Sequence, residues 1–348
     1  MARTSQEMQR LKDKPTTASG RRDRNIPAHD DPSSQLGHAE VVSGRWLVKA
    51  ILIVLAASGV ALYLTICLLF YQGQWQFAFF PPKTLQPAAA TVAASSGLPI
   101  TDIRFDTTQE GIERLNGWWI PADIAFSPTA SLSHFVVLFC PNGHTDLPDN
   151  VDALKAFHAL GVSVFAFDYQ GFGKSQAGHP SQQKAYANGI AALNYVTGLR
   201  HIPADHVVIY GARLGAAVAA HVAQTSPKIA GLVLEDPQPS LAAEIKHEQH
   251  IHLLPMWLIV QDRFDISGII PTLKIPKLIL STPAMHRYAS GAAEIYTGAT
   301  APKQQASIAE SSNQTVYALP KWRNAVGNFL NFIAEQSSNR PAPASTLK

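Results

Sequence analysis

The segment 206–224, HVVIYGARLGAAVAAHVAQ, constrains the fold of this chain more than any other part of the sequence. Residues 207–210 are β-branched or aromatic and favour a buried strand, and two closely spaced glycines then frame a tight turn. The alanine-rich stretch that follows favours a helix, because alanine has the highest helix propensity. A strand that turns directly into a helix is the repeating unit of sheets with parallel strands. We therefore expect a parallel sheet with helices packed against it.

Apolar segments of strand length alternate with helical segments along the rest of the chain, which implies a mainly parallel sheet that helices cover on both faces. A chain of 348 residues has room for one domain of about 250 residues and appendages. We place this domain at residues 101–336, with a partly helical cap at about 237–270 and a flexible tail at 337–348. Strands are predicted over 101–106, 113–120, 134–140, 162–168, 207–210, 229–234, 277–281 and 315–319, and the main helices over 149–160, 182–199 and 322–335.

An uncharged apolar run over residues 50–70 precedes the domain. A run of about 20 apolar residues can cross a bilayer, and it exceeds the roughly 7–15 residues in the apolar region of a cleaved signal peptide. We predict one transmembrane helix over 46–71 that acts as a signal anchor, followed by a juxtamembrane segment and linker over 72–100. Aromatic residues typical of the two membrane interfaces flank the run: Trp46, Tyr71, Trp75, Phe77, Phe79 and Phe80.

Basic residues gather before the apolar run. The polar segment 1–45, which we expect to be disordered, contains Arg21, Arg22, Arg24 and Arg45, and Lys49 follows it, whereas only Lys83 comes soon after the run. The positive-inside rule places the N-terminus in the cytoplasm. The large domain would then lie on the periplasmic or extracellular side of the cell membrane.

Composition excludes several other classes of protein. The formal net charge of +3 is too small to indicate a nucleic-acid partner. Cys67 and Cys140 are the two cysteines, which is too few for a disulfide framework. The sequence implies no cofactor, and it names no protein partner.

Four stretches then narrow the fold: FAFFPPK (77–83) with GWWIP (117–121), VSVFAFDYQGFGKS (162–175), VVIYGARLGAAVAA (207–220), and LVLEDPQPS (232–240) with LLPMWLIVQDRFD (253–265). They resemble the α/β-hydrolase superfamily, and in particular its single-span, membrane-anchored serine-hydrolase branch, which includes lipid and acyl-thioester hydrolases. The resemblance implies the α/β-hydrolase fold, with a small cap, after one transmembrane helix. It also implies catalysis by a Ser nucleophile, an acid and a His, in that order along the chain.

The resemblance places the catalytic positions on residues that cannot perform this chemistry. Residues 211–215, GARLG, occupy the frame of the nucleophile elbow G-x-S-x-G, so Arg213 stands where the family has its serine. The acid position falls on Ala284 or Met285, and no His follows His286, although the family's His lies after the last strand. We therefore expect a pseudoenzyme with no intact catalytic residue.

A remnant of the site could still bind an anion. Arg213 precedes a predicted helix, and helix N-termini favour negative charge. The family's oxyanion segment, H-G-N-x-G, corresponds to CPNGH (140–144). We expect a small anionic or acylated ligand here, with these candidate binding residues: Arg213, Leu214, Asn142, Gly143 and His144. In the alternative, Arg213 pairs with a nearby carboxylate, such as Asp168 or Glu235, and only fills the former pocket.

Two other functions stay open at the level of sequence. The first is an active ester, thioester or lipid hydrolase with a displaced nucleophile, either Cys140 with His144 or Ser240 in the cap. The second is a structural interaction module of a membrane assembly, whose former active-site cleft would be filled by side chains.

Two motifs suggest sites that we do not expect. His247, His250 and His252 lie near Glu244 and Glu248, but His252 falls off the helical face that the other two histidines share, so we predict no metal site. The segment 171–175, GFGKS, resembles the end of a phosphate loop. Asp168 stands where that loop needs its first glycine, which excludes a nucleotide site.

Overall fold

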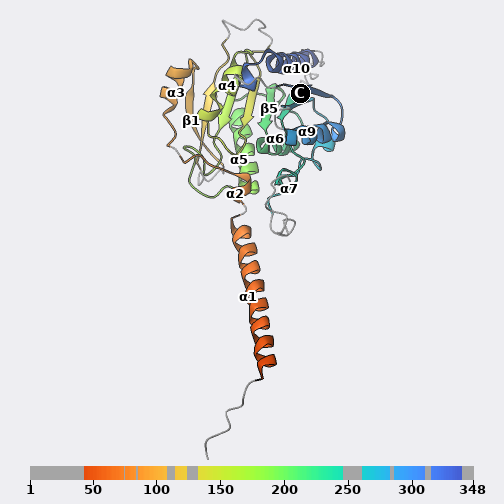
Figure 1. Cartoon of the computed structure of the whole chain (residues 1–348). Helices are drawn as coiled ribbons and strands as arrows, with labels where there is room; N and C mark the ends of the chain where they lie inside the picture. The colour runs from red at the N-terminus through yellow and green to blue at the C-terminus, as the bar shows by residue number, and fades with distance from the viewer. Residues whose placement is uncertain are drawn as a thin grey trace, which may run out of the picture. The chain divides into compact units, whose positions relative to one another are not determined.

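The computed structural model describes residues 43–73, 75–83, 85–107, 114–123, 132–245, 261–282, 286–309 and 315–338 (Figure 1). The chain divides into two compact units, residues 1–59 and residues 60–348. Residues 1–42 of the expected disordered tail lie outside the described residues, and so do residues 339–348 of the expected C-terminal tail.

Helix α1, Gly44–Gln72, begins in the first unit and ends in the second. Its 29 residues correspond to about 43 Å of helix, and its most apolar 18-residue window has a mean hydropathy of 2.5 with none of its residues buried. Among the helices that the structure describes, α1 alone is long and apolar enough to cross a membrane. The predicted apolar helix is therefore present, as a candidate membrane span.

An eight-stranded sheet forms the centre of the second unit, in the order β1-β2-β4-β3-β5-β6-β7-β8. The β1 and β2 strands form an antiparallel hairpin, β2 also pairs antiparallel with β4, and all pairs from β4 to β8 are parallel. The predicted mainly parallel sheet of the α/β-hydrolase fold is confirmed. The strands are Thr101–Asp106, Arg114–Ile120, Val136–Cys140, Ser163–Phe167, Val207–Ala212, Gly231–Glu235, Lys277–Ser281 and Lys303–Ser307.

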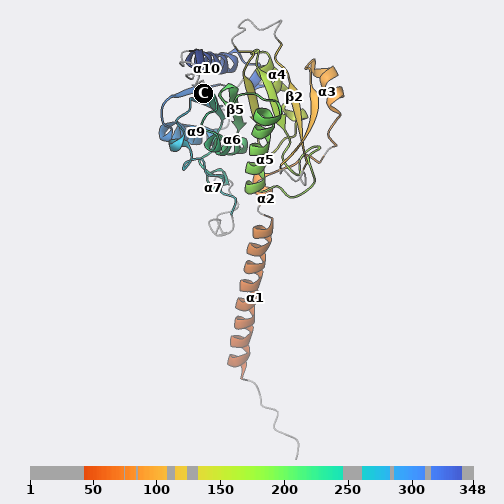
Figure 2. The ribbon, with the colours of Figure 1, turned by 180° about the vertical axis from the view of Figure 1, so that it is seen from behind.

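Helices cover both faces of the sheet (Figure 1 and Figure 2). Alternate residues of the central strands enter different core clusters: Leu138 packs on one side of the sheet and Phe139 on the other. The first cluster contains buried residues of α5 (Gln182–Asn194), α6 (Leu214–Thr225) and α9 (His286–Gly298). The second contains buried residues of α3 (Ala89–Ser96), α4 (Val151–His158) and α10 (Pro320–Ser338).

Two sequence predictions for this unit were wrong. The last strand is β8, KQQAS, and the predicted strand at 315–319 is instead the 3₁₀ helix η6, Val316–Ala318. An edge strand pairs on one side only and can be polar, so β8 carried no apolar signal. The expected linker contains α3, because Ala89 and Val92 are buried in the second core cluster.

The cap is described in two pieces. Helix α7, Leu241–Ile245, belongs to the first piece, and residues 261–270 form the second. The predicted histidine cluster at 247–252 lies outside the described residues, as do Ala284 and Met285. A short helix, α2 (Trp75–Ala78), follows α1 in the sequence and precedes the strands of the sheet.

Candidate functional site

The turn between β5 and α6 has the geometry of a nucleophile elbow with an arginine at its apex. Arg213 has φ 52° and ψ −116°, which is a strained backbone conformation for a residue other than glycine. A β-carbon on Gly211 would overlap the backbone of Gly215, and one on Gly215 would overlap the carbonyl groups of Cys140 and Pro141. The two glycines are therefore required by close packing of the turn, independently of the residue that the turn presents.

The loop after β3 lies beside this turn, because β3 and β5 are neighbours and Cys140 pairs with Gly211. Gly143 has φ 80°, and a β-carbon there would lie 3.1 Å from Cδ2 of Leu214. The Asn142 side chain stabilises its own loop, since its Oδ1 accepts hydrogen bonds from the His144 amide at 2.8 Å and from the Thr145 hydroxyl at 3.0 Å. The structure thus brings Gly143 and Leu214 together next to Arg213. The side-chain oxygen of Asn142 is already occupied by hydrogen bonds within its own loop.

The segment after α1 forms part of the site, which sequence reasoning missed. The Phe80 N–H donates to the Gly143 carbonyl at 2.9 Å, and the Phe80 ring lies 4.7 Å from the His144 ring. Phe79 is buried and packs edge-on against the rings of Tyr169, Phe172 and Phe264. We had assigned Phe79 to an interfacial aromatic belt. The structure corrects this, because aromatic residues after an apolar run serve equally well as core residues.

Asp168, directly after β4, links the segment between α1 and β1 to the loop after β3. Its Oδ2 accepts from Nε2 of Gln86 at 3.0 Å, and its Oδ1 accepts from the Leu147 amide at 2.9 Å. Burial raises the pKa of Asp168 to about 7, while these hydrogen bonds favour the carboxylate and oppose the shift. Gly173 is required here, because a side chain on it would overlap the Asp168 carboxylate.

Glu235, at the end of β6, has a different set of partners. Its Oε2 accepts from the Tyr210 hydroxyl and from Nε1 of Trp322, each at 3.0 Å, and its Oε1 accepts from the Tyr317 hydroxyl at 3.2 Å. Burial raises the pKa of Glu235 to about 7, against the effect of these three donors.

Within the described ranges, Arg213 does not form an ion pair with either of these two carboxylates, and the wider alternative of a nearby carboxylate partner stays a prediction. Glu235 contacts Arg213 only through the backbone, where its carbonyl accepts from the Arg213 N–H at 2.8 Å. Another buried carboxylate, Asp236, follows β6 and accepts from the amide and the hydroxyl of Thr282, so it ties the ends of β6 and β7 together.

Cys140 and Ser240 are the two candidates for a displaced nucleophile, and each contributes to the fold instead. Cys140 is fully buried, and burial raises the pKa of its thiol far above the usual value, so it does not form the reactive thiolate. The Ser240 hydroxyl accepts from the Ala243 amide at 3.2 Å at the start of α7. No group of three or more His, Cys, Asp or Glu residues suited to a metal occurs in the described part of the chain.

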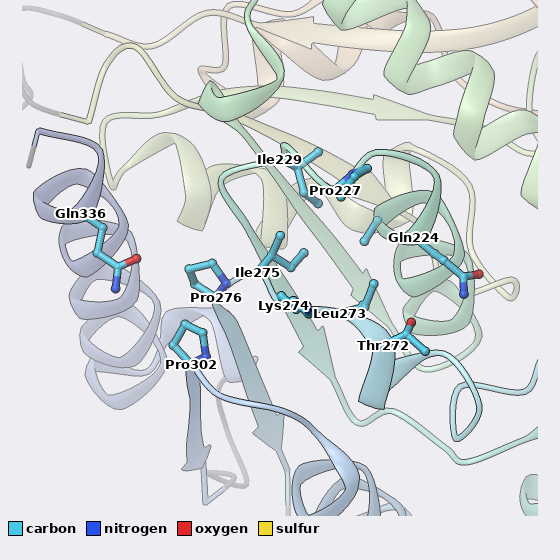
Figure 3. Close-up of a pocket in the computed structure, with 11 residues that line it drawn as sticks. Gln224, Pro227, Ile229, Thr272, Leu273, Lys274, Ile275, Pro276, Pro302 and Gln336 are labelled. Carbon is cyan, nitrogen blue, oxygen red and sulfur yellow. The ribbon is translucent and has the colours of Figure 1, made fainter. Parts of the chain in front are cut away.

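A cavity of about 470 Å³ lies at the N-terminal ends of β6, β7 and β8 (Figure 3), whereas the elbow follows the C-terminal end of β5. Its lining includes Gln224 at the end of α6, Leu273 before β7 and Gln336 near the end of α10. The elbow is at the other end of α6, whose 12 residues span about 18 Å. This cavity is therefore separate from the position where the fold places its catalytic serine.

Comparisons with known proteins agree with this geometry. Residues 136–325 match the family model described as serine aminopeptidase, S33. A protein of Mycobacterium tuberculosis H37Rv described as uncharacterized is 30% identical over 237 residues, which cover 68% of this chain and 76% of that protein. The α/β-hydrolase domain-containing protein WAV2 of Arabidopsis thaliana is 29% identical over 152 residues, 41% of this chain and 47% of that protein.

Solved structures show the same fold. The Pyrococcus furiosus esterase Pf2001 superposes with a TM-score of 0.56 at 17% identity, over 73% of this chain and 98% of the esterase. An α/β hydrolase from Vibrio vulnificus gives a TM-score of 0.51 at 17% identity, over 74% of this chain and 87% of that one. The sheet order, the elbow geometry and these matches lead to one conclusion: the chain belongs to the α/β-hydrolase superfamily, in the family described as serine aminopeptidase, S33.

Proposed function

We propose that this chain is a membrane-tethered α/β-hydrolase-like protein that binds a small anionic or acylated ligand and does not hydrolyse it by the serine mechanism. The observation that carries the proposal is Arg213 at the apex of a well-formed elbow. A guanidinium is protonated at all physiological pH values and cannot attack a carbonyl carbon. The turn therefore presents a fixed positive charge where the fold normally presents a nucleophile.

The surroundings of Arg213 support binding of an anion. The residue is partly exposed, so a ligand can reach it. Arg213 is the N-cap of α6, and the first amides of a helix have no partner within the helix and favour negative charge. A carboxylate or a phosphate matches the planar donors of a guanidinium, which often bind it through two hydrogen bonds.

The rest of the catalytic machinery supports the absence of serine hydrolysis. No His follows His286 in the sequence, so a nucleophile at the elbow would have no base after the last strand. In a related triad enzyme, loss of the Ser or the His alone costs on the order of 10⁶ in rate. Cys140 and Ser240 do not compensate, because both have structural roles.

A fluorophosphonate probe tests the catalytic half of this proposal. We expect no labelling of the purified full chain in detergent micelles, with an active serine esterase in the same tube as the positive control. We also expect that Arg213→Ser stays unlabelled, because a serine without a base is a weak nucleophile. Labelling of the wild-type chain that one Ser→Ala substitution removes would overturn the proposal.

Thermal unfolding with added ligand tests the binding half. Inorganic phosphate and decanoate should raise the unfolding midpoint of the wild-type chain, and Arg213→Ala should abolish the rise. Arg213→Lys should keep part of it, because the charge remains while the paired donors are lost. Arg323→Ala, at an exposed position of α10, is the matched control and should behave like the wild type.

The membrane location is a separate part of the proposal. The support is the apolar α1 and the excess of basic residues before it. We expect the chain to resist extraction by carbonate. Protease added to the outside of intact cells should digest the domain and spare an N-terminal tag. A chain that carbonate releases, or a tag that is digested with the domain, would contradict this topology.

One observation favours a second candidate, an interaction module with no ligand. The space beside Gly143 is taken by the Ala78 carbonyl and by the side chains of Leu214 and Phe79. A module of this kind would show no midpoint change with any anion, in either the wild type or the Arg213 variants.

A further inference from the structure

An apolar groove lies where α1 ends and α2 begins. Its volume is about 430 Å³, and Leu69, Phe70, Gly73, Gln76 and Phe80 line it. None of these side chains is charged. The groove lies entirely within the second unit of the chain, in a segment of twelve consecutive residues that begins in the last turn of α1.

The groove is continuous with the apolar surface of α1. Leu69 and Leu68 are both more than half exposed, as are most large apolar residues along this helix. Such a surface is stable when hydrocarbon covers it. A polar soluble ligand would find one amide and no charge in the groove, whereas a hydrocarbon chain matches the lining. The exposed Lys83 follows Phe80 by three residues and provides a cation for a headgroup phosphate.

Phe80, which lines the groove, also contacts the loop of the candidate site. Phe80 is bonded to Gly143 through its backbone and packs against the His144 ring. Gly143 in turn approaches Leu214, the first residue of α6 after Arg213. A hydrocarbon chain that lies along Phe80 would therefore end beside the Gly143 loop, which we assign to ligand binding.

We propose that this groove binds an acyl chain of a bilayer phospholipid. The inference rests on the proposed function, because it assumes that α1 lies in a membrane, and it makes the membrane the source of the acylated ligand. The groove holds the hydrocarbon, and Phe80 joins the groove to the Gly143 loop through its backbone hydrogen bond and its ring contact.

Site-specific photo-crosslinking tests this in the full chain, reconstituted in vesicles of phosphatidylcholine and phosphatidylglycerol. Benzoylphenylalanine replaces Gln76 in the groove, Leu62 on the middle of α1, or Leu85, which is 98% exposed beyond the groove. We expect phospholipid adducts at position 76 at several times the yield at position 62, and none at position 85. Equal yields at 62 and 76 mean unspecific contact with surrounding lipid and overturn the proposal, as does absence of adducts at 76.

A variant that fills the groove provides the second arm. Leu69→Trp should lower the yield at position 76 to the level at position 62 and leave position 62 unchanged. An unchanged yield at 76 would place the captured lipid outside the groove and overturn the proposal.

The groove and the anion site fail in different ways. If phosphate stabilises the chain through Arg213 but position 76 shows no enriched capture, the groove is wrong and the proposed function stands. If capture at 76 is enriched but no anion shifts the unfolding midpoint, the groove is right and the Arg213 site is wrong.

Discussion

At the scale of single residues, the elbow has a strained backbone although the residue at its apex is an arginine. Arg213 has a positive φ, which costs of order 1–3 kcal/mol for a residue with a β-carbon. Glycine at this position would remove most of that cost. The retention of an arginine in a strained conformation fits a residue that is used for its side chain.

Arg213→Gly should therefore stabilise the fold and abolish anion binding. We expect an increase of about 1 kcal/mol in the free energy of unfolding, because glycine adopts this backbone conformation without strain. Thermal unfolding of the full chain, with and without phosphate, measures both effects. Gln224→Gly in α6 is the control and should lose about 1 kcal/mol, since glycine normally weakens a helix. A loss of stability in Arg213→Gly equal to that of the control would contradict the prediction.

At the scale of elements, Glu235 attaches the C-terminal part of the chain to the sheet. Its carboxyl group joins Tyr210 of β5, Tyr317 of η6 and Trp322 of α10. The Trp322 ring also packs edge-on against Phe157 of α4, with 5.1 Å between ring centroids. One buried acid thus links β5 and β6 to η6 and α10, which lie about 80 residues or more further along the chain.

Loss of one donor to Glu235 should destabilise the domain measurably. Tyr317→Phe keeps the ring and removes the hydroxyl that bonds the buried Glu235 carboxyl group and the Tyr210 hydroxyl, at a cost of about 1–3 kcal/mol. The unfolding midpoint should fall by about 2–6 °C for a domain of this size. Tyr296→Phe on α9, where the ring packs under Lys303, is the matched control and should shift the midpoint by less than about 1 °C. An unchanged midpoint in Tyr317→Phe would show that the hydrogen bond contributes nothing.

At the scale of the whole molecule, three buried carboxyl groups contribute to the dependence of stability on pH. Burial raises the pKa of Glu235 and of Asp168 to about 7, and it raises the pKa of Asp146 to about 6, where Asp149 adds to the shift. In the unfolded chain these groups ionise near their usual values, close to pH 4. Between those values and pH 7 the folded state binds more protons than the unfolded state. Stability contributed by these groups therefore falls as pH rises through this window and is constant above it.

Glu235→Gln should reduce this pH dependence. The wild-type chain should lose up to about 3 kcal/mol, relative to the variant, between pH 4.5 and pH 7.5, because the variant has no proton to retain at this position. Thermal unfolding across this pH range measures the difference. Glu335→Gln, at an exposed position of α10, should leave the wild-type profile unchanged. Parallel profiles for the wild type and Glu235→Gln would contradict the assignment of a raised pKa to Glu235.

The features that depend on neighbouring residues along the chain could be predicted from the amino-acid sequence alone. The apolar run of α1, the central strands and the elbow all have their signal within about 20 consecutive residues, through hydrophobic length, periodicity and the spacing of Gly211 and Gly215. The sequence also placed Arg213 at the apex of the turn.

The contacts between side chains of distant segments could be identified only from the three-dimensional structure. Whether Phe79 faces a membrane or a core, which partners bind Glu235, and where a polar edge strand lies all depend on segments that are distant in sequence. The burial that raises the pKa of Asp168 likewise comes from packing of the segment between α1 and β1 and of the loop after β3 around it. Hydrophobic pattern fixes which faces are buried, but contacts between those faces form only when the sheet brings them together.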